Sequence, residues 1–200
     1  SSLSSLEALP GGAGKPVLLF SANDGVSGRE PWITDGTAGG TAILEDLVSD
    51  PVDSPLSLFV TVGNRVFFNG PGGRWVSDGN SAHTQFLSSA SIDTTGFLSV
   101  SGVNIPDKDK GLPTAAAVGH VLFFRSKAKL WRSDGTVLGT YLVSNAPNEV
   151  SCLAAVGNLL YFSADDGAHG QELWRSDGTT GGTYRVIDLN PGSNSTLPSN

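Results

Sequence analysis

Two loops of this 200-residue chain gather side chains that could do chemistry. The first loop supplies Asp24, Arg29 and Glu30, and the second supplies Asp165, Asp166, His169 and Glu172. Carboxylate oxygens on a glycine-rich, turning backbone are ligands that suit Ca²⁺, and the candidate calcium ligands are Asp24, Asp165 and Asp166. Ordinary turn chemistry is the alternative, in which each carboxylate accepts hydrogen bonds from backbone N–H groups of its own loop.

The sequence shows no pattern typical of a zinc site or of a catalytic or nucleotide-binding motif. His83, His120 and His169 lack the spacing of metal ligands, which argues against zinc. The chain contains no Gly-x-Ser-x-Gly, phosphate-binding loop or dinucleotide fingerprint. We therefore expect a protein that is not an enzyme and that requires no cofactor.

A short phrase that begins with tryptophan recurs four times and predicts the elements that position these loops. Its copies are Trp32–Gly36, Trp75–Gly79, Trp131–Gly135 and Trp174–Gly178, and they use all 4 tryptophans. They lie 43, 56 and 43 residues apart, in a chain with 26 glycines. Repeats of roughly 40–50 residues, rich in strand formers and turns, are typical of propeller blades.

The phases of the repeat predict an all-β fold of four four-stranded antiparallel blades in a single domain over residues 1–200. The blades cover about 1–48, 55–88, 112–145 and 150–190, and a long insert covers 88–113. In each blade the first strand contributes few acids, and Glu7 is the only one expected there. The fourth strands are predicted at 41–48, 83–87, 140–144 and 183–189. The glycines of Gly63-Asn64, Gly119-His120 and Gly157-Asn158 are expected to turn the first strand into the second.

Two ways of closing the blades into a ring remain open. Four blades could close within one chain, which would leave no large open edge. Alternatively, two chains could form an eight-bladed ring, because the copies are also related by a shift of 99 residues.

The phrase Glu172-Leu-Trp-Arg-Ser-Asp-Gly-Thr179 resembles the ELWxxDGT repeat of bacterial proteins that are often predicted to be secreted. Tyr161–Gly170 and Phe20–Glu30 also fit that pattern. Pro31 replaces the leucine in the first copy, and the second and third copies lack the glutamate and the long loop before it. The resemblance implies repeated blades and an extracellular or cell-surface location, and it implies little about activity.

The repeated side chains are expected to be structural. Each tryptophan should pack between adjacent blades, with carbohydrate stacking as the alternative. Asp35, Asp78, Asp134 and Asp177 begin the turn before the fourth strand, where a carboxylate can bind the N–H groups of its own turn.

Function is expected where the blades differ. The loop before the tryptophan is long in the first and last blades: Phe20 precedes Trp32 by 12 residues, whereas Phe68 precedes Trp75 by 7. The insert adds an alternating charge run that contains Asp107. These segments leave the blades on one face, and loops on a rigid scaffold are common binding sites. The predicted ligand-binding residues are Asp24, Arg29, Glu30, Asp107, Asp165, Asp166, His169 and Glu172. For Glu30 and Glu172 a structural ion pair with Arg29 or Arg175 is the alternative.

The composition of the chain limits the classes of partner that we expect it to bind. A net charge of −7 disfavours nucleic acid and anionic membranes, and no apolar run is long enough to span a bilayer. The chain begins at Ser1 and has no methionine, which fits a processed protein or an excised fragment. The favoured function is a non-catalytic extracellular binding module for a glycan or a cell-surface protein. The alternatives are a hydrolase with acidic residues at the ring centre, and a structural module that assembles into a homo-oligomer.

Overall fold

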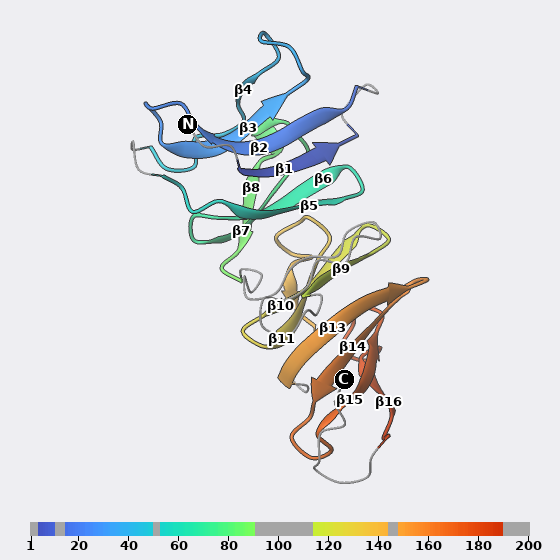
Figure 1. The fold of residues 1–200 in the computed structure, drawn as a ribbon. Helices are drawn as coiled ribbons and strands as arrows, with labels where there is room; N and C mark the ends of the chain where they lie inside the picture. The colour runs from blue at the N-terminus through green and yellow to red at the C-terminus, as the bar shows by residue number, and fades with distance from the viewer. Residues whose placement is uncertain (1–3, 11–14, 50–52, 91–113, 144–147, 190–200) are drawn as a thin grey trace. The chain divides into compact units, whose positions relative to one another are not determined.

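The structure is a computed structural model, and it describes residues 4–10, 15–49, 53–90, 114–143 and 148–189 (Figure 1). It confirms four four-stranded antiparallel sheets, and in each of them the strands lie side by side in chain order. The only helical element in these ranges is a 3₁₀ turn, η2 (Ser81–His83). No helix in the described part of the chain is long and apolar enough to cross a membrane.

The strand bounds are as follows. Sheet one contains β1 (Ser4–Leu9), β2 (Val17–Asn23), β3 (Arg29–Thr34) and β4 (Ala42–Ile43). Sheet two contains β5 (Ser57–Val62), β6 (Arg65–Gly70), β7 (Gly73–Ser77) and β8 (Gln85–Ser88). Sheet three contains β9 (Ala115–Val118), β10 (Val121–Ser126), β11 (Lys129–Ser133) and β12 (Tyr141–Leu142). Sheet four contains β13 (Asn148–Val156), β14 (Leu159–Asp165), β15 (Gln171–Ser176) and β16 (Tyr184–Ile187).

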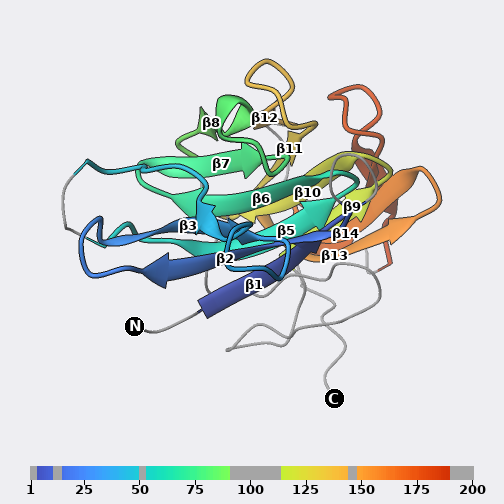
Figure 2. The ribbon, with the colours of Figure 1, turned by 90° about the horizontal axis from the view of Figure 1, so that it is seen from above.

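The chain divides into two compact units. Ser1–Ser91 holds sheets one and two, and Ile92–Asn200 holds sheets three and four. Figures 1 and 2 show the strands of the first unit in blue to green and those of the second in yellow to red. A single propeller domain over 1–200 and the closure of its ring stay predictions.

The predicted turns between the first two strands of a blade are confirmed. Gly63, Gly119 and Gly157 have φ values of 63°, 59° and 59°. Each is the first of two residues between paired strand ends, as between Val62 and Arg65. A positive φ at the first turn residue but not at the second is the type II′ pattern, in which glycine is free of the steric cost that other residues carry.

The fourth strands are shorter than predicted: β4 has only two residues, where 41–48 was expected. In sheets one and four, a glutamate side chain bonds the backbone that follows the fourth strand. The N–H of Leu47 donates to Oε2 of Glu30 at 2.9 Å, and the N–H of Leu189 donates to Oε2 of Glu172 at 3.0 Å. A carboxylate thus satisfies the backbone where a strand carbonyl would otherwise do so.

One expectation about the first strands is wrong, namely that Glu7 is the only acidic residue on them. β13 begins at Asn148 rather than at 151, so Glu149 joins Glu7 as an acid on a first strand. Glu7 is already engaged, since its Oε1 accepts the N–H of Thr61 on β5 at 3.0 Å.

The core lies between sheets, and each sheet has two sides that we name from its second strand. In sheets one to four, in that order, the forward side carries Leu19, Phe67, Phe123 and Tyr161. The backward side carries Phe20, Phe68, Phe124 and Phe162. In the first unit, Leu19 and Leu44 of sheet one pack with Val66 and Phe68 of sheet two. In the second unit, the forward side of sheet three packs in the same way on the backward side of sheet four. Each unit is therefore a pair of sheets joined forward side to backward side.

Candidate functional site

The long loop of sheet one connects β2 to β3 and is closed by its own acidic and amide side chains. Asn23 Oδ1 accepts the N–H of Gly25 at 2.6 Å, and Asp24 Oδ1 accepts the N–H groups of Val26 and Ser27 at 2.8 Å each. The positive φ of 83° at Gly25 allows this tight reversal. The loop is thus a folded turn with a fixed backbone.

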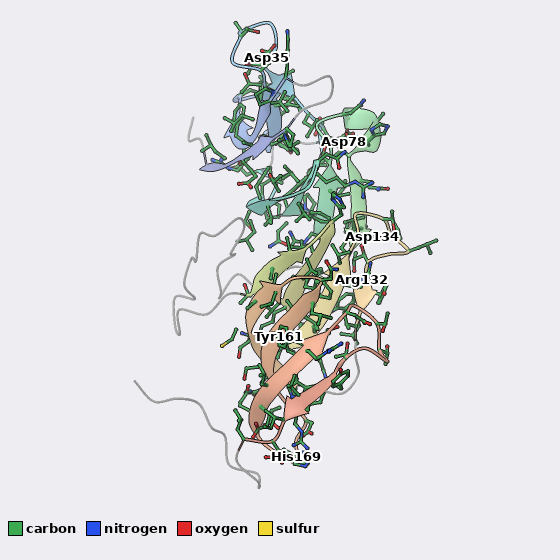
Figure 3. All side chains as sticks on the ribbon, turned by 90° about the vertical axis from the view of Figure 1, so that its right-hand side faces the viewer. Asp35, Asp78, Arg132, Asp134, Tyr161 and His169 are labelled. Atoms are coloured by element: carbon green, nitrogen blue, oxygen red, sulfur yellow. The ribbon has the colours of Figure 1, made fainter. Side chains whose placement is uncertain are left out.

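The long loop of sheet four, between β14 and β15, has the same construction. Asp165 Oδ1 accepts the N–H of Gly167 at 2.7 Å, and Asp166 Oδ1 accepts those of Ala168 and His169 at 2.9 and 3.0 Å. His169 adds its ring, whose Nδ1 lies 2.8 Å from Asp166 Oδ2. Figure 3 labels His169 at the end of sheet four.

Sheets two and three have only two-residue turns at the same place. Gly70 pairs with Gly73 across Pro71-Gly72, and Ser126 pairs with Lys129. The predicted contrast in loop length is therefore confirmed.

The backbone bonds fix the charge of the loop acids. Hydrogen bonds from the N–H groups of Ser27 and Val26 lower the pKa of Asp24. Burial acts to raise the pKa of Asp166, but bonds from Ala168 and His169 outweigh it and lower the pKa to about 2. Both side chains are carboxylates at neutral pH, and they are stabilised in place by the turns they close.

Glu30 and Glu172 are predicted binding residues that the structure places in the interior. They are 0% and 2% exposed. The oxygens of Glu30 accept the N–H of Leu47 and the hydroxyl of Ser54, the latter at 2.8 Å. The donors to the two glutamates are backbone N–H groups and a hydroxyl rather than arginine. Burial raises the pKa of Glu30, although the bonds from Leu47 and Ser54 oppose that rise.

Arg29 lies against its own sheet. Its neighbours include Asp53, a residue that the sequence analysis did not single out. Arg29 donates to Ser21 Oγ at 3.1 Å, and its Nε lies 4.0 Å from Asp53. Asp53 Oδ1 also accepts from Asn23 at 2.6 Å, so it ties the loop to the chain that leads to β5. The link spans 30 residues and has no local sequence signal. Asp107 and residues 91–113 of the insert lie outside the described residues.

Within the described ranges, no group of three or more His, Cys, Asp or Glu side chains is close enough to hold a metal ion. Asp24 belongs to sheet one, whereas Asp165 and Asp166 belong to sheet four, and each bonds its own turn. The local geometry accordingly supports the turn role of these acids.

A second set of turns, before the fourth strands, is closed by the repeated aspartates (Figure 3). Asp177 Oδ1 accepts both the N–H and the hydroxyl of Thr179 at 2.8 Å. That hydroxyl oxygen in turn accepts the N–H of Gly182 at 2.9 Å. Asp35 and Asp134 repeat the pattern with Thr37 and Thr136. The predicted turn role is confirmed for these three acids.

The turn of sheet two is a variant of the same design. Asn80 stands where the other turns have threonine, and its N–H donates to Asp78 at 3.1 Å. Its side chain caps η2 by accepting the N–H of Ala82 at 2.9 Å. His83 Nδ1 completes the turn, 2.8 Å from Asp78 Oδ2.

The tryptophans pack as predicted where the structure shows two sheets in contact. Trp174 belongs to the core between sheets three and four, and Trp75 packs on the core between sheets one and two. Trp174 Nε1 donates to the carbonyl of Ala164 at 3.0 Å. Trp32 and Trp131 stack on Phe20 and Phe124 of their own sheets.

Comparison with known proteins identifies an all-β, propeller-like fold. No protein-family model matches the sequence, and the search of curated proteins gives no match. Among solved structures, puromycin hydrolase is similar with a TM-score of 0.52 and 14% identity, over 100% of this chain and 30% of that one. A mutant of puromycin hydrolase gives the same TM-score and identity over 99% and 30%. A Mycobacterium tuberculosis puromycin-hydrolyzing peptidase has a TM-score of 0.46 and 12% identity, over 96% and 30%. This chain thus spans about 30% of the length of the structures it resembles.

Proposed function

We propose that this protein is a non-catalytic binding module built from propeller blades, which acts outside the cell or at its surface. Its ligand is a glycan or a cell-surface protein. The observation that carries the proposal is the contrast between the sheets: sheets one and four carry long loops with a fixed backbone, whereas sheets two and three have minimal turns. A loop that is already ordered loses little conformational entropy when it binds.

The loop residues divide into those that shape the turn and those that can meet a ligand. Asp24, Asp165 and Asp166 hold the backbone, while Glu30 and Glu172 anchor the following strand from the interior. Contact with a ligand then falls to exposed side chains such as Val26, which is 75% exposed, and His169. Arg29 positions the loop of sheet one through Asp53, and Asp107 is proposed to contact the ligand as well.

The positions of the acidic residues favour a binding function over a hydrolase. A glycoside hydrolase needs two carboxyl groups about 5–9.5 Å apart that face one substrate. Glu7, the acid expected near the ring centre, bonds the backbone of Thr61. Hydrolysis therefore remains the second proposal, and assembly into a homo-oligomer is the third. The ring is proposed to close either with four blades or with eight blades from two chains.

The test is a glycan array probed with labelled protein in parallel calcium and EDTA buffers. We expect selective binding that His169→Ala weakens by about tenfold or more, because this residue stands on the fixed loop. Leu138→Ser is the control. Leu138 is 94% exposed, and it lies in the turn between β11 and β12 of sheet three, outside the long loops. Binding that both changes weaken equally, or that neither affects, would contradict the assignment of the loop.

A further inference from the structure

The long loops of sheets one and four place different side chains at one equivalent position. Two residues after the first glycine of each loop, sheet one has Ser27 and sheet four has His169. In both loops this side chain bonds the acid that closes the turn. Ser27 Oγ donates to Asp24 Oδ2 at 3.3 Å, and His169 Nδ1 lies 2.8 Å from Asp166 Oδ2. Sheet four therefore adds a ring with a second nitrogen, Nε2, where sheet one has a hydroxyl group.

The bond to Asp166 fixes which nitrogen of His169 carries the proton. Burial acts to raise the pKa of Asp166, but bonds from Ala168 and His169 lower it to about 2, so the side chain is a carboxylate that can only accept. Nδ1 therefore holds the proton of the neutral ring, and Nε2 keeps a lone pair. Within the described part of the chain, Nε2 has no hydrogen-bond partner. The side chain is 37% exposed at the end of sheet four (Figure 3), so the loop presents an acceptor to solvent.

The charges beside His169 disfavour an anionic ligand. Asp165 and Asp166 precede it within four residues, and residues 164–172 contain no lysine or arginine. The whole chain carries a net charge of −7. A carboxylate or sulfate group can only accept hydrogen bonds, so at Nε2 it would meet a lone pair and two nearby negative charges. A hydroxyl group has a proton that Nε2 can accept, and the position therefore suits a neutral ligand with hydroxyl groups.

We propose that His169 is a specificity-determining residue whose Nε2 accepts a hydrogen bond from a hydroxyl group of a neutral glycan. Asp166 is a positioning residue, because it holds the proton on Nδ1 and so keeps Nε2 an acceptor. The carboxylates of acidic glycans find no donor at this nitrogen. This inference rests on the proposed binding function, and it adds the class of glycan that the loop of sheet four selects.

The test compares the binding of the full chain to two sets of immobilised oligosaccharides. One set is neutral, and the other consists of the uronic-acid counterparts, in which carboxylates replace the hydroxymethyl groups. We expect the wild type to bind the neutral set at least about tenfold more tightly. His169→Ala should weaken binding to the neutral set and reduce this preference, because it removes the acceptor.

Asp166→Asn reverses the hydrogen bond without rebuilding the turn. Its Oδ1 can still accept the N–H groups of Ala168 and His169, while its amide nitrogen, in the place of Oδ2, donates to Nδ1. The ring proton then moves to Nε2, and the preference should fall to about threefold or less. Asp165→Asn is the matched control, since it removes the same charge and keeps the bond from Gly167. Its effect on the preference should be smaller than that of Asp166→Asn.

Nitrogen-15 NMR of the imidazole tests the acceptor without any ligand, with His169→Ala to assign the signals. The neutral ring should carry its proton on Nδ1 in the wild type and on Nε2 in Asp166→Asn. A wild-type proton on Nε2, equal binding of neutral and acidic glycans, or equal effects of the two Asp→Asn changes would overturn this inference and leave the proposed binding function in place. Binding to surface proteins alone would do the same. Binding to neither glycans nor surface proteins would overturn both proposals.

Discussion

Asp177 illustrates how single residues set the shape of each repeat. Its carboxylate accepts two bonds from Thr179, of which the backbone bond contributes most to lowering the pKa of Asp177. We expect Asp177→Ala to lower the free energy of unfolding by about 1 kcal/mol, as loss of a comparable helix cap does. Asp177→Asn keeps an acceptor oxygen and should retain part of that stability. Urea unfolding of both variants checks this, and equal stability of wild type and Asp177→Ala would contradict the turn role.

Glu30 gives a prediction about pH. Burial raises its pKa above the ordinary value of 4.5, so the folded state holds this proton more tightly than the unfolded state does. The stability that protonation contributes is present below pH 4.5 and is lost as the pH rises through the folded pKa. Glu30→Gln has no proton to lose, and its amide can still accept from Leu47 and donate to Ser54.

The stability of wild type relative to Glu30→Gln should therefore fall between about pH 4 and neutrality. Urea unfolding at several pH values measures the difference, in which most other titrations cancel. Parallel curves for the two proteins would show that the folded pKa of Glu30 is not raised. Glu30→Ala should destabilise at every pH, by about 1–3 kcal/mol, since it leaves the partly buried N–H of Leu47 without its acceptor.

At the scale of elements, the turn before the fourth strand of sheets one, three and four needs one glycine for space. A Cβ at Gly182 would lie 2.0 Å from Asp177 Oδ1, whereas one at Gly181 would meet nothing within 4 Å. Gly182→Ala is expected to cost about 1–3 kcal/mol through overpacking. Gly181→Ala should be neutral or slightly stabilising. Thermal unfolding of this adjacent pair compares the two, and similar effects would mean that the carboxylate does not occupy the space beside Gly182.

The long loops lead to a prediction about calcium. Because Asp24 and Asp166 already bond their own backbones, we expect EDTA to leave the melting temperature unchanged. Scanning calorimetry with and without added Ca²⁺ measures this. A lower melting temperature in EDTA that Asp166→Asn abolishes would show instead that a cation holds the loop.

The elements also show where sequence reasoning succeeds. Alternating apolar residues and glycine turns predict the inner strands well, because burial and positive φ leave local signals. The fourth strands are shorter than predicted, and in sheets one and four the backbone beyond them donates to the carboxylates of Glu30 and Glu172, 17 residues away in the sequence. Such a bond has no local pattern. The loop acids were recognised, but their inward bonding depends on backbone geometry that residue types alone do not specify.

At the scale of the whole molecule, four copies of one repeat produce two pairs of sheets. The four sheets share their strand order but differ in which positions are exposed. Equivalent positions differ in exposure, as Val186 and Val143 do, because their burial depends on which sheet comes next. The repeat predicts which residues face a neighbouring blade, but the neighbour of the last blade has no sequence signal. The fold was therefore predictable to the level of sheets, whereas the exposure of single positions emerges only when the sheets are compared position by position.

The most direct test of the binding function removes one loop and keeps its sheet. Residues 166–170 would be replaced by the Pro-Gly turn that joins the paired ends of β6 and β7 in sheet two. The measurement is binding of labelled protein to immobilised glycans and extracted surface proteins, with circular dichroism to show that the sheets remain. The account predicts that binding falls at least about tenfold while the fold is retained. Undiminished binding by the folded variant would contradict the central claim that the fixed loops form the binding site.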